Sequence, residues 1–214
     1  PFLEAQGGEK YATVAFCLLY YLKLLLIPHP LTWDYYPYHI ELMQWNNWQV
    51  LVSVLVYGVL LVLAVKGLKR RKWYAWAIWY YFATISLTSN IVINIGAFMS
   101  ERFLFFPSLA FCFVLAYFLN TVLPKLFGKE LQGRQIAVAF LVLILALYSV
   151  KTVSRNRVWK DSYTLFGHDV EISENSAKGN SSWGSELYDQ AQKKKDSAER
   201  NAILRKARPY MKKA

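Results

Sequence analysis

Long apolar blocks constrain the fold of this chain more than any other feature of its sequence. Four of them approach or exceed the roughly 17 to 25 residues that cross the hydrocarbon core of a bilayer, and they cover residues 49–66, 73–98, 103–123 and 136–150. The last block is the shortest, and the cations within 151–155 are expected to extend it by snorkelling to the interface. The pattern predicts four membrane-spanning helices.

A fifth block, residues 11–27, is apolar apart from Lys23. Such a segment is either a short span or a helix that lies in the membrane interface, and both alternatives remain open at this point. The predicted membrane region covers residues 1–153, with four or five apolar helices and outer loops. The chain opens at Pro1 without a Met or a charged leader, so we expect it to be part of a longer polypeptide.

The net charge of +11 follows the membrane pattern rather than a nucleic-acid site. Lys66 and the four cations of 69–72 lie between the first two predicted spans, which places that loop in the cytoplasm by the positive-inside rule. Lys125, Lys129 and Arg134 lie in the second loop on the same side.

Counting spans from that loop assigns a side to every other segment. Residues 28–48 and 100–102 are predicted to lie on the outer, non-cytoplasmic face, together with everything after about residue 150. The carboxy-terminal region is therefore expected outside the cytoplasm.

The composition becomes charged and polar after residue 151, which predicts a soluble helical region over residues 154–214. Its spacing is typical of a tetratricopeptide repeat. The alternative is an ordinary helical hairpin, because apolar residues at helical spacing usually indicate packing. A single repeat cannot bury its apolar face, so we expect the array to continue past the last residue. The repeat positions are Asn180, Trp183, Gly184 and Leu187 in the first helix, and Ala207, Met211 and Ala214 in the second.

The sequence offers no ligand pattern for a metal. Cys17 and Cys112 both fall in apolar blocks, where a thiol usually behaves as a small hydrophobe. None of the three His residues has a His or Cys partner at ligand spacing. We expect neither a metal site nor a cofactor.

One outer segment with residues suited to chemistry is the loop 28–39. It is rich in Pro and aromatic residues, and its candidates for a polar cavity are His29, Asp34, Tyr35 and His39. The prolines stop the preceding helix and hold an extended path, because each removes a donor and fixes φ. The alternative is an aromatic belt at the membrane surface, where Trp and Tyr concentrate.

A second outer segment begins with Glu101 and Arg102, two charges at the edge of a predicted span. Ionisable residues at such a position are functional candidates by default, and Arg presents a planar fork that matches phosphate. The alternative is a structural ion pair that caps a helix end. Asn90 and Asn94 are expected on one helix face near the outer side, where they line a polar cavity or bond to a neighbouring helix.

These two outer segments resemble a known family. Residues 100–108, Ser-Glu-Arg-Phe-Leu-Phe-Phe-Pro-Ser, resemble the Ala-Glu-Arg-x-Leu-Tyr-Leu-Pro-Ser signature of the transmembrane and tetratricopeptide-repeat protein O-mannosyltransferases. Residues 28–35 are similar to that family's Pro-His-Pro-Leu-x-x-Asp-Tyr segment, and residues 175–178 sit where its repeats begin. The resemblance runs from about residue 11 to the end, although Phe105 replaces the Tyr of the signature and loses its hydroxyl.

The resemblance implies an all-α enzyme similar to GT-C glycosyltransferases, which move a sugar from a polyprenyl-phosphate carrier to protein outside the cytoplasm. For this chain it implies transfer of a sugar, mannose in that family, to Ser or Thr of proteins. The setting is a bacterial inner membrane or the endoplasmic reticulum membrane. Membrane lipid, the polyprenyl-phosphate sugar and acceptor proteins bound by the repeats are the implied partners, and nucleic acid is not one.

Carried to this sequence, the resemblance places Glu101, Arg102 and Pro107 on the donor side of the site, with Arg102 against the lipid phosphate. The four candidates of the loop 28–39 would shape the same cavity. GT-C enzymes usually carry their catalytic acid in a first outer loop near the amino terminus, which is expected to precede this chain. No catalytic base is therefore assigned.

Two other classes of protein remain open. A membrane-anchored tetratricopeptide adaptor without catalytic activity would use the spans only as an anchor, and replacing Arg102 would leave it unaffected. A transporter needs polar residues lined up through several spans, and apart from Asn90 and Asn94 the predicted spans contain few.

Overall fold

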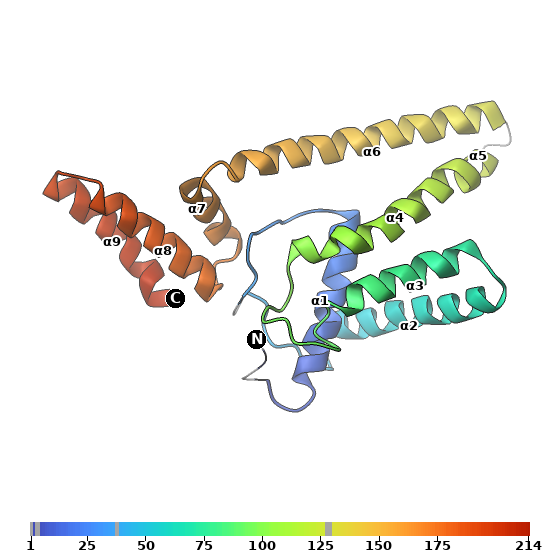
Figure 1. The fold of residues 1–214 in the computed structure, drawn as a ribbon, viewed down its shortest axis with the longest axis horizontal. Helices are drawn as coiled ribbons and strands as arrows, with labels where there is room; N and C mark the ends of the chain where they lie inside the picture. Colours follow the sequence, from blue (N-terminus) through green and yellow to red (C-terminus); the bar gives the residue numbers. More distant parts are fainter. Residues whose placement is uncertain (1, 3–4, 37–38, 127–129) are drawn as a thin grey trace.

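The computed structural model describes residues 2, 5–36, 39–126 and 130–214, and within these residues all regular structure is helical (Figure 1). The predicted all-α fold class is confirmed. The elements in chain order are α1 (Glu9–Leu26), α2 (Trp48–Lys69), α3 (Trp73–Ser86), the 3₁₀ turn η1 (Glu101–Leu104), α4 (Phe105–Tyr117), the π-helical turn η2 (Phe118–Val122), α5 (Leu123–Leu126), α6 (Glu130–Val158), α7 (Ser162–Ile172), α8 (Ala177–Gln192) and α9 (Ser197–Lys213).

Three helical segments of the described residues are long and apolar enough to cross a membrane. They are Trp48–Lys69, Glu101–Leu126 and Leu131–Val158, and they confirm three of the four predicted spans. Their apolar windows are only 22%, 22% and 6% buried within the protein. So much outward-facing apolar surface is unfavourable in water and is typical of contact with lipid. The chain is a membrane protein.

The remaining predicted span, one helix over residues 73–98, is wrong. Helix α3 ends at Ser86 after 14 residues, a rise of about 21 Å that falls short of the roughly 30 Å hydrocarbon core. The side chains of Thr88 and Ser89 bond back to carbonyl oxygens three residues earlier. Such local bonds compete with continued helix.

The side chain of Asn90 links the start of the non-helical segment after α3 to the later part of that segment. Its backbone is left-handed, with φ of 61°, a conformation that Asn tolerates better than most residues. Its side-chain amide donates to the carbonyl oxygens of Ala97 at 2.8 Å and Phe98 at 3.1 Å. Asn90 is fully buried whereas Asn94 is exposed, so the expectation that they share a helix face is also wrong.

Helix α1, the segment with two open readings, is a buried helix and not one of the three candidate spans. Val14 and Tyr21 on this helix are almost fully buried in the main apolar core. The helix runs across α2, α3 and α4 instead of along them (Figure 1). The Tyr57 hydroxyl on α2 lies 3.0 Å from the carbonyl oxygen of Leu18 and 2.6 Å from the Tyr81 hydroxyl on α3. Tyr57 thus links α2 to both α1 and α3.

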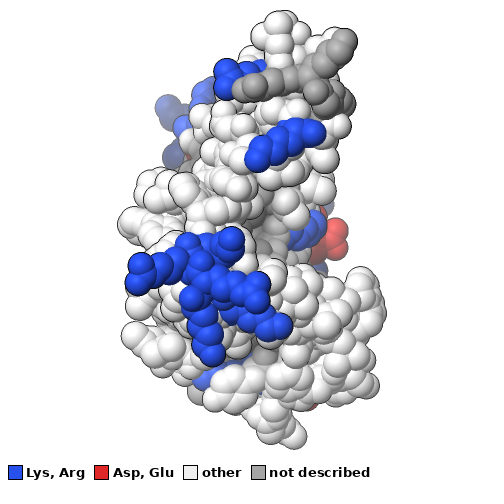
Figure 2. All heavy atoms as spheres, turned by 90° about the vertical axis from the view of Figure 1, so that its right-hand side faces the viewer, with Lys and Arg blue, Asp and Glu red and all other residues white. Residues whose placement is uncertain are grey.

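The connections between the long helices gather at two opposite ends (Figure 1). One end holds the α2–α3 turn and the region where α5 meets α6, and basic side chains dominate its charged surface (Figure 2). The other end holds the loop between α1 and α2, the segment after α3, and α7 to α9. This grouping agrees with the one obtained by counting spans, because α3, although too short for a full span, still runs from the basic end toward the other end (Figure 1). The cytoplasmic side of the basic end stays a prediction. Lys129, one of the predicted inner cations, lies outside the described residues.

Helices α5 and α6 meet at the basic end through a close backbone contact. Pro124 removes a helical donor and crowds the carbonyl four residues before it, and the helix widens to the π turn η2 just before this proline. A Cβ on Gly133 of α6 would lie 2.5 Å from the Cα and the carbonyl oxygen of Pro124. Only glycine permits this approach.

Helices α8 and α9 pack as the expected hairpin. Leu187 and Ala207 are buried between them, and a Cβ on Gly184 would lie 2.7 Å from the Sδ of Met211. Four of the positions that predicted a repeat therefore face the partner helix. Helix α6 continues past residue 153 to Val158, so the chain passes from its apolar to its polar part without a break in the helix.

Candidate functional site

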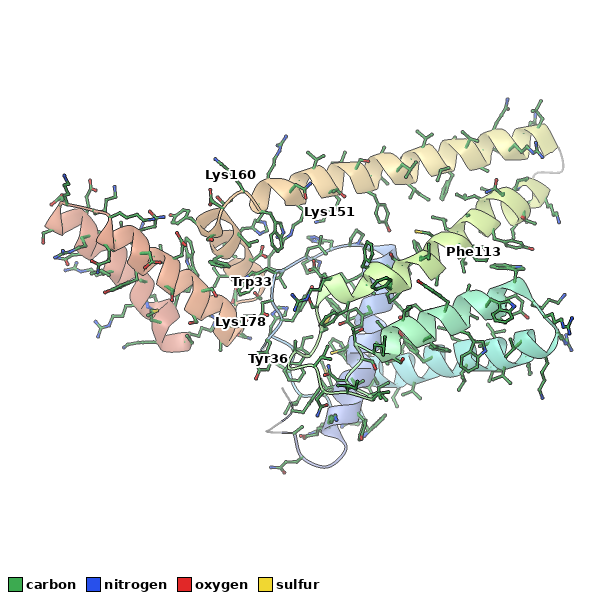
Figure 3. The ribbon with its side chains drawn as sticks, viewed as in Figure 1. Trp33, Tyr36, Phe113, Lys151, Lys160 and Lys178 are labelled. Atoms are coloured by element: carbon green, nitrogen blue, oxygen red, sulfur yellow. The ribbon has the colours of Figure 1, made fainter. Side chains whose placement is uncertain are left out.

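The loop that follows α1 forms the frame of the candidate site, and it is called the outer loop below (residues 27–36). It leaves α1 at Ile27, whose N–H still donates to the Lys23 carbonyl oxygen at 2.7 Å. Pro28 and Pro30 then favour an extended path. Beyond them the loop bonds to η1, α7 and α8 in turn, and Figure 3 shows Trp33 at the centre of this region.

Glu101 of η1 accepts two hydrogen bonds from the outer loop on one carboxylate oxygen. The backbone N–H of Thr32 donates to Oε1 at 2.6 Å, and the hydroxyl of Tyr35 donates to the same atom at 2.8 Å. Thr32 and Tyr35 are both 2% exposed, so water does not compete for this oxygen from their side. The two sequence segments that resemble the family motifs therefore meet at one carboxylate.

The ionisation of Tyr35 follows from this contact. Burial raises the pKa of Tyr35, and the charge of Glu101 beside it raises the pKa further. The hydroxyl therefore keeps its proton across the neutral range and remains a donor.

Asp169 of α7 binds the backbone of Trp33, the outer-loop residue that follows Thr32. The backbone N–H of Trp33 donates to its Oδ2 at 2.7 Å. Arg155 of α6 binds both carboxylate oxygens, each at 2.6 Å, and His168 contacts Oδ1 at 2.8 Å. Asp169 is fully buried. Burial alone would raise the pKa of Asp169, but the hydrogen bonds from Arg155 and His168 outweigh it and hold the pKa below its ordinary value.

Asp34 bonds to α8 instead of η1. Its Oδ1 accepts from the Lys178 ammonium at 3.2 Å, and the hydroxyl of Ser176, which caps α8, donates to the carbonyl oxygen of Tyr36 at 2.9 Å. Lys178 also lies over the ring of Trp33, 4.8 Å from its centre, a geometry that favours cation–π attraction. The outer loop is thus attached to the start of the helical hairpin as well.

The two histidines of the predicted cavity lie in different surroundings. His29 is exposed, and the ammonium of Lys151 on α6 lies 3.3 Å from its Nδ1. His39 is partly buried, with its ring 5.5 Å from that of Tyr35. Burial lowers the pKa of His39, and the charge of Asp34 offsets part of this effect. Of the two, only His39 lies beside the group around Glu101.

Arg102 is exposed and makes no ion pair with any described residue, including its neighbour Glu101. Its guanidinium lies 5.4 Å from the centre of the Phe103 ring. Pro107 is buried in the first turn of α4. A proline is well tolerated there, because the N–H it lacks would have no partner within the helix.

An apolar groove of about 660 Å³ lies between α4 and α6. On α6 its lining extends from Arg134 near the basic end to Tyr148 near the outer end, a rise of about 21 Å at 1.5 Å per residue. The hydroxyl of Tyr148 donates to the last carbonyl oxygens of α1, those of Leu25 at 3.0 Å and Leu26 at 3.1 Å. The groove therefore ends next to the start of the outer loop.

Within residues 2, 5–36, 39–126 and 130–214, no group of three or more His, Cys, Asp or Glu side chains is arranged to hold a metal ion. The carboxylates of the site, those of Asp34, Glu101 and Asp169, instead accept hydrogen bonds from donors within the protein. Such an arrangement can position a loop and bind an anionic ligand through the exposed cations at its edge.

Sequence reasoning missed the residues of α6 and α7, and of the turn that follows α7, that hold the outer loop. Arg155 and Asp169 belong to no motif, and Ser173, whose hydroxyl lies 3.1 Å from that of Thr32, carries no local signal either. The one available hint is the position of Arg155 just beyond an apolar block, where cations are common for general reasons.

The fold and the site define a polytopic, all-helical membrane protein whose candidate site is built from two loops at one end of its spans. Comparison with known proteins then identifies relatives. The chain is 28% identical over 193 residues to protein O-mannosyl-transferase TMTC1 of Mus musculus, covering 86% of the chain and 20% of the mouse protein. It is 26% identical to human TMTC1 over the same share of the chain, and 32% identical over 92 residues to Drosophila melanogaster Tmtc2, over 43% of the chain.

These relatives confirm the resemblance that the two motifs indicate. The chain spans about a fifth of the length of the TMTC1 proteins it matches. No protein-family model matches the chain, and no solved structure matches it.

Proposed function

We propose that this chain is part of an integral membrane glycosyltransferase. The enzyme transfers a sugar, mannose by analogy with the names of its relatives, from a polyprenyl-phosphate carrier to Ser or Thr of proteins. The reaction takes place on the non-cytoplasmic side, at the end of the spans opposite the basic loops. The helical hairpin α8–α9 begins an array that binds acceptor proteins.

The observation that carries the proposal is the meeting of Tyr35 and Glu101 at 2.8 Å. These two residues come from the two separate segments that resemble the family motifs. If the two motifs served packing alone, their polar side chains would not need to meet in one cluster at a membrane edge. Their convergence at the end away from the basic loops supports a site that faces outward.

The groove between α4 and α6 supports a lipid-linked donor. Its lining is mostly apolar and comes from two membrane-spanning segments, so a hydrocarbon chain from the bilayer is an occupant of matching chemistry. A chain lying in it would bring its head group to the outer end near Tyr148 and the outer loop. The sugar and phosphate would then lie at the boundary between lipid and water.

Arg102 is the residue we propose for the lipid phosphate. It is exposed, and no described carboxylate neutralises it. An Arg in that condition can offer its planar fork to a phosphate that arrives from the bilayer. As the glycosidic bond breaks, negative charge grows on the leaving phosphate, and a fixed cation stabilises it most at that moment.

The reaction also needs a base to accept the proton of the acceptor hydroxyl. Asp169 is fully buried and paired with Arg155, and Asp34 is paired with Lys178. Glu101 is engaged by two donors. We therefore assign these carboxylates to holding the site together and leave the base unassigned.

The test is transfer of labelled mannose from a polyprenyl-phosphate donor by the full-length parent of this chain. Arg102→Ala is compared with Arg157→Ala, a matched control because Arg157 is also exposed and lies at the outer end of α6. Loss of one stabilising contact in the transition state typically costs a hundredfold or more. We expect a fall of about that size in Arg102→Ala and little change in the control.

Equal transfer by the two variants would refute the role of Arg102. No transfer by the wild-type parent, with other sugars also tried, would favour the membrane-anchored tetratricopeptide adaptor instead.

A further inference from the structure

Two neighbouring backbone amides of the outer loop are held by two carboxylates from different parts of the protein. The N–H of Thr32 donates to Glu101, which belongs to residues 100–108, called the membrane-edge motif below. The N–H of Trp33 donates to Asp169, which lies in α7 just before the helical hairpin. One extended dipeptide therefore connects the two parts.

The carboxylate of Asp169 is itself rigidly held. Arg155 engages both of its oxygens at 2.6 Å, and this two-pronged geometry fixes the plane of the carboxylate as well as its distance. The side chains of Arg155 and Asp169 are 11% and 0% exposed. Because both side chains are so well buried, neither can move to a new partner in water without leaving the other as an unpaired charge inside the protein.

A third contact holds Thr32 of the outer loop. The hydroxyl of Thr32 lies 3.1 Å from that of Ser173, and Ser173 also donates to the carbonyl oxygen of Asp169 at 2.9 Å. Movement of α7 would therefore pull on Thr32 and Trp33 together. Since Thr32 and Tyr35 set the position of the Glu101 carboxylate, that movement would reach the membrane-edge motif.

We propose that Asp169 and Arg155 are positioning residues for the site, acting on Glu101 through the backbone of Thr32 and Trp33. They contact neither donor nor acceptor. They set the outer loop against η1, so that the helical hairpin and the membrane-edge motif share one loop. Where transfer is measured, this inference rests on the glycosyltransferase function proposed above.

The primary test is amide hydrogen exchange at single-residue resolution in the full-length parent. In the wild type, the amides of Thr32 and Trp33 are both expected to exchange slowly. Asp169→Asn keeps the shape of the side chain but removes the charge that binds Arg155. We expect exchange at both amides to rise at least tenfold. The matched control is Asp189→Asn, at an exposed position of α8 with no bonded partner among the described residues, and it should change neither.

The decisive point is the amide of Thr32, which Asp169 does not contact. Faster exchange at Trp33 alone, or at neither amide, would overturn the proposal. If amides of α2 also exchange faster, the fold is disturbed, and Arg155→Lys then decides the question. That variant keeps the positive charge and loses the two-pronged geometry, and faster exchange at both loop amides is again the expected result.

Kinetics of mannose transfer supply the second measurement. A positioning role lowers kcat in Asp169→Asn, with the KM for the lipid-linked donor changed less than twofold, because the donor contacts remain. A rise in KM without a fall in kcat would contradict it. If the wild-type parent shows no transfer, the proposed function fails while the exchange result still decides whether the loop is coupled.

Discussion

Replacing Glu101 tests whether its carboxylate holds the outer loop in place. Glu101→Ala removes the acceptor for two buried donors, the N–H of Thr32 and the hydroxyl of Tyr35. A buried donor without a partner costs roughly 1–3 kcal/mol, so the loop should lose about 2–6 kcal/mol of its stability against local opening. Glu101→Gln keeps an acceptor oxygen and loses only the charge.

The cost of Glu101→Gln should therefore be smaller. A hydrogen bond to a charged group contributes about 1.5–3 kcal/mol, against about 0.5–1.5 kcal/mol for a neutral one. With two bonds affected, we expect about 2 kcal/mol, which corresponds to an opening equilibrium roughly 30-fold larger, since about 1.4 kcal/mol is tenfold. The order of effects, Ala above Gln above wild type, is the main expectation.

The assay is proteolysis of the outer loop in the full-length parent in detergent, under conditions where cleavage follows the population of the open form. Glu174→Ala is the control, because Glu174 is exposed and its carboxylate accepts no hydrogen bond from any residue that the structure describes. If the outer loop is cleaved no faster in Glu101→Ala than in Glu174→Ala, the anchoring role is refuted. Equal effects of Ala and Gln would show that retaining the acceptor oxygen does not matter.

Three further predictions follow from single contacts. Tyr35→Phe should destabilise the outer loop by about 1–3 kcal/mol, because it deletes the hydroxyl that donates to a carboxylate, whereas Tyr36→Phe should change the cleavage rate little. Gly133→Ala should lower the thermal unfolding temperature in detergent, because its Cβ would meet backbone atoms of α5 at 2.5 Å, while Gly58→Ala, with open space around it, should be neutral or slightly stabilising. Because the pKa of Asp169 is held below its ordinary value, its contribution to stability should be full above about pH 4 and be lost as the pH falls further; Asp169→Asn should remove that acid-dependent part, as followed by tryptophan fluorescence.

The spans could be predicted from the sequence wherever composition alone decides them. Three apolar blocks are spanning helices because a long apolar helix satisfies its own backbone in lipid. The block over 73–98 is apolar like the other three, but the side chains of Ser89 and Asn90 bond to backbone carbonyl oxygens, and the helix ends before them at Ser86. Hydropathy averages such residues with their apolar neighbours and does not register the bonds they make.

The site could be predicted in its parts and not in its connections. Glu101 and Tyr35 stand out from their own segments, yet they are 66 positions apart and their contact depends on the fold. Asp169 is 136 positions from the residue whose amide it binds, and nothing in its local sequence distinguishes it from a surface carboxylate of an ordinary helix. Its role follows only from burial and from the Arg155 fork.

The choice of donor by the purified full-length parent in lipid nanodiscs is the direct test of the proposed reaction. Labelled mannose is offered either on polyprenyl phosphate or on a nucleotide, with acceptor protein present in both cases. We expect transfer from the polyprenyl-phosphate donor and none from the nucleotide-linked sugar. Transfer from the nucleotide-linked sugar alone, or from neither donor, would contradict the proposed reaction.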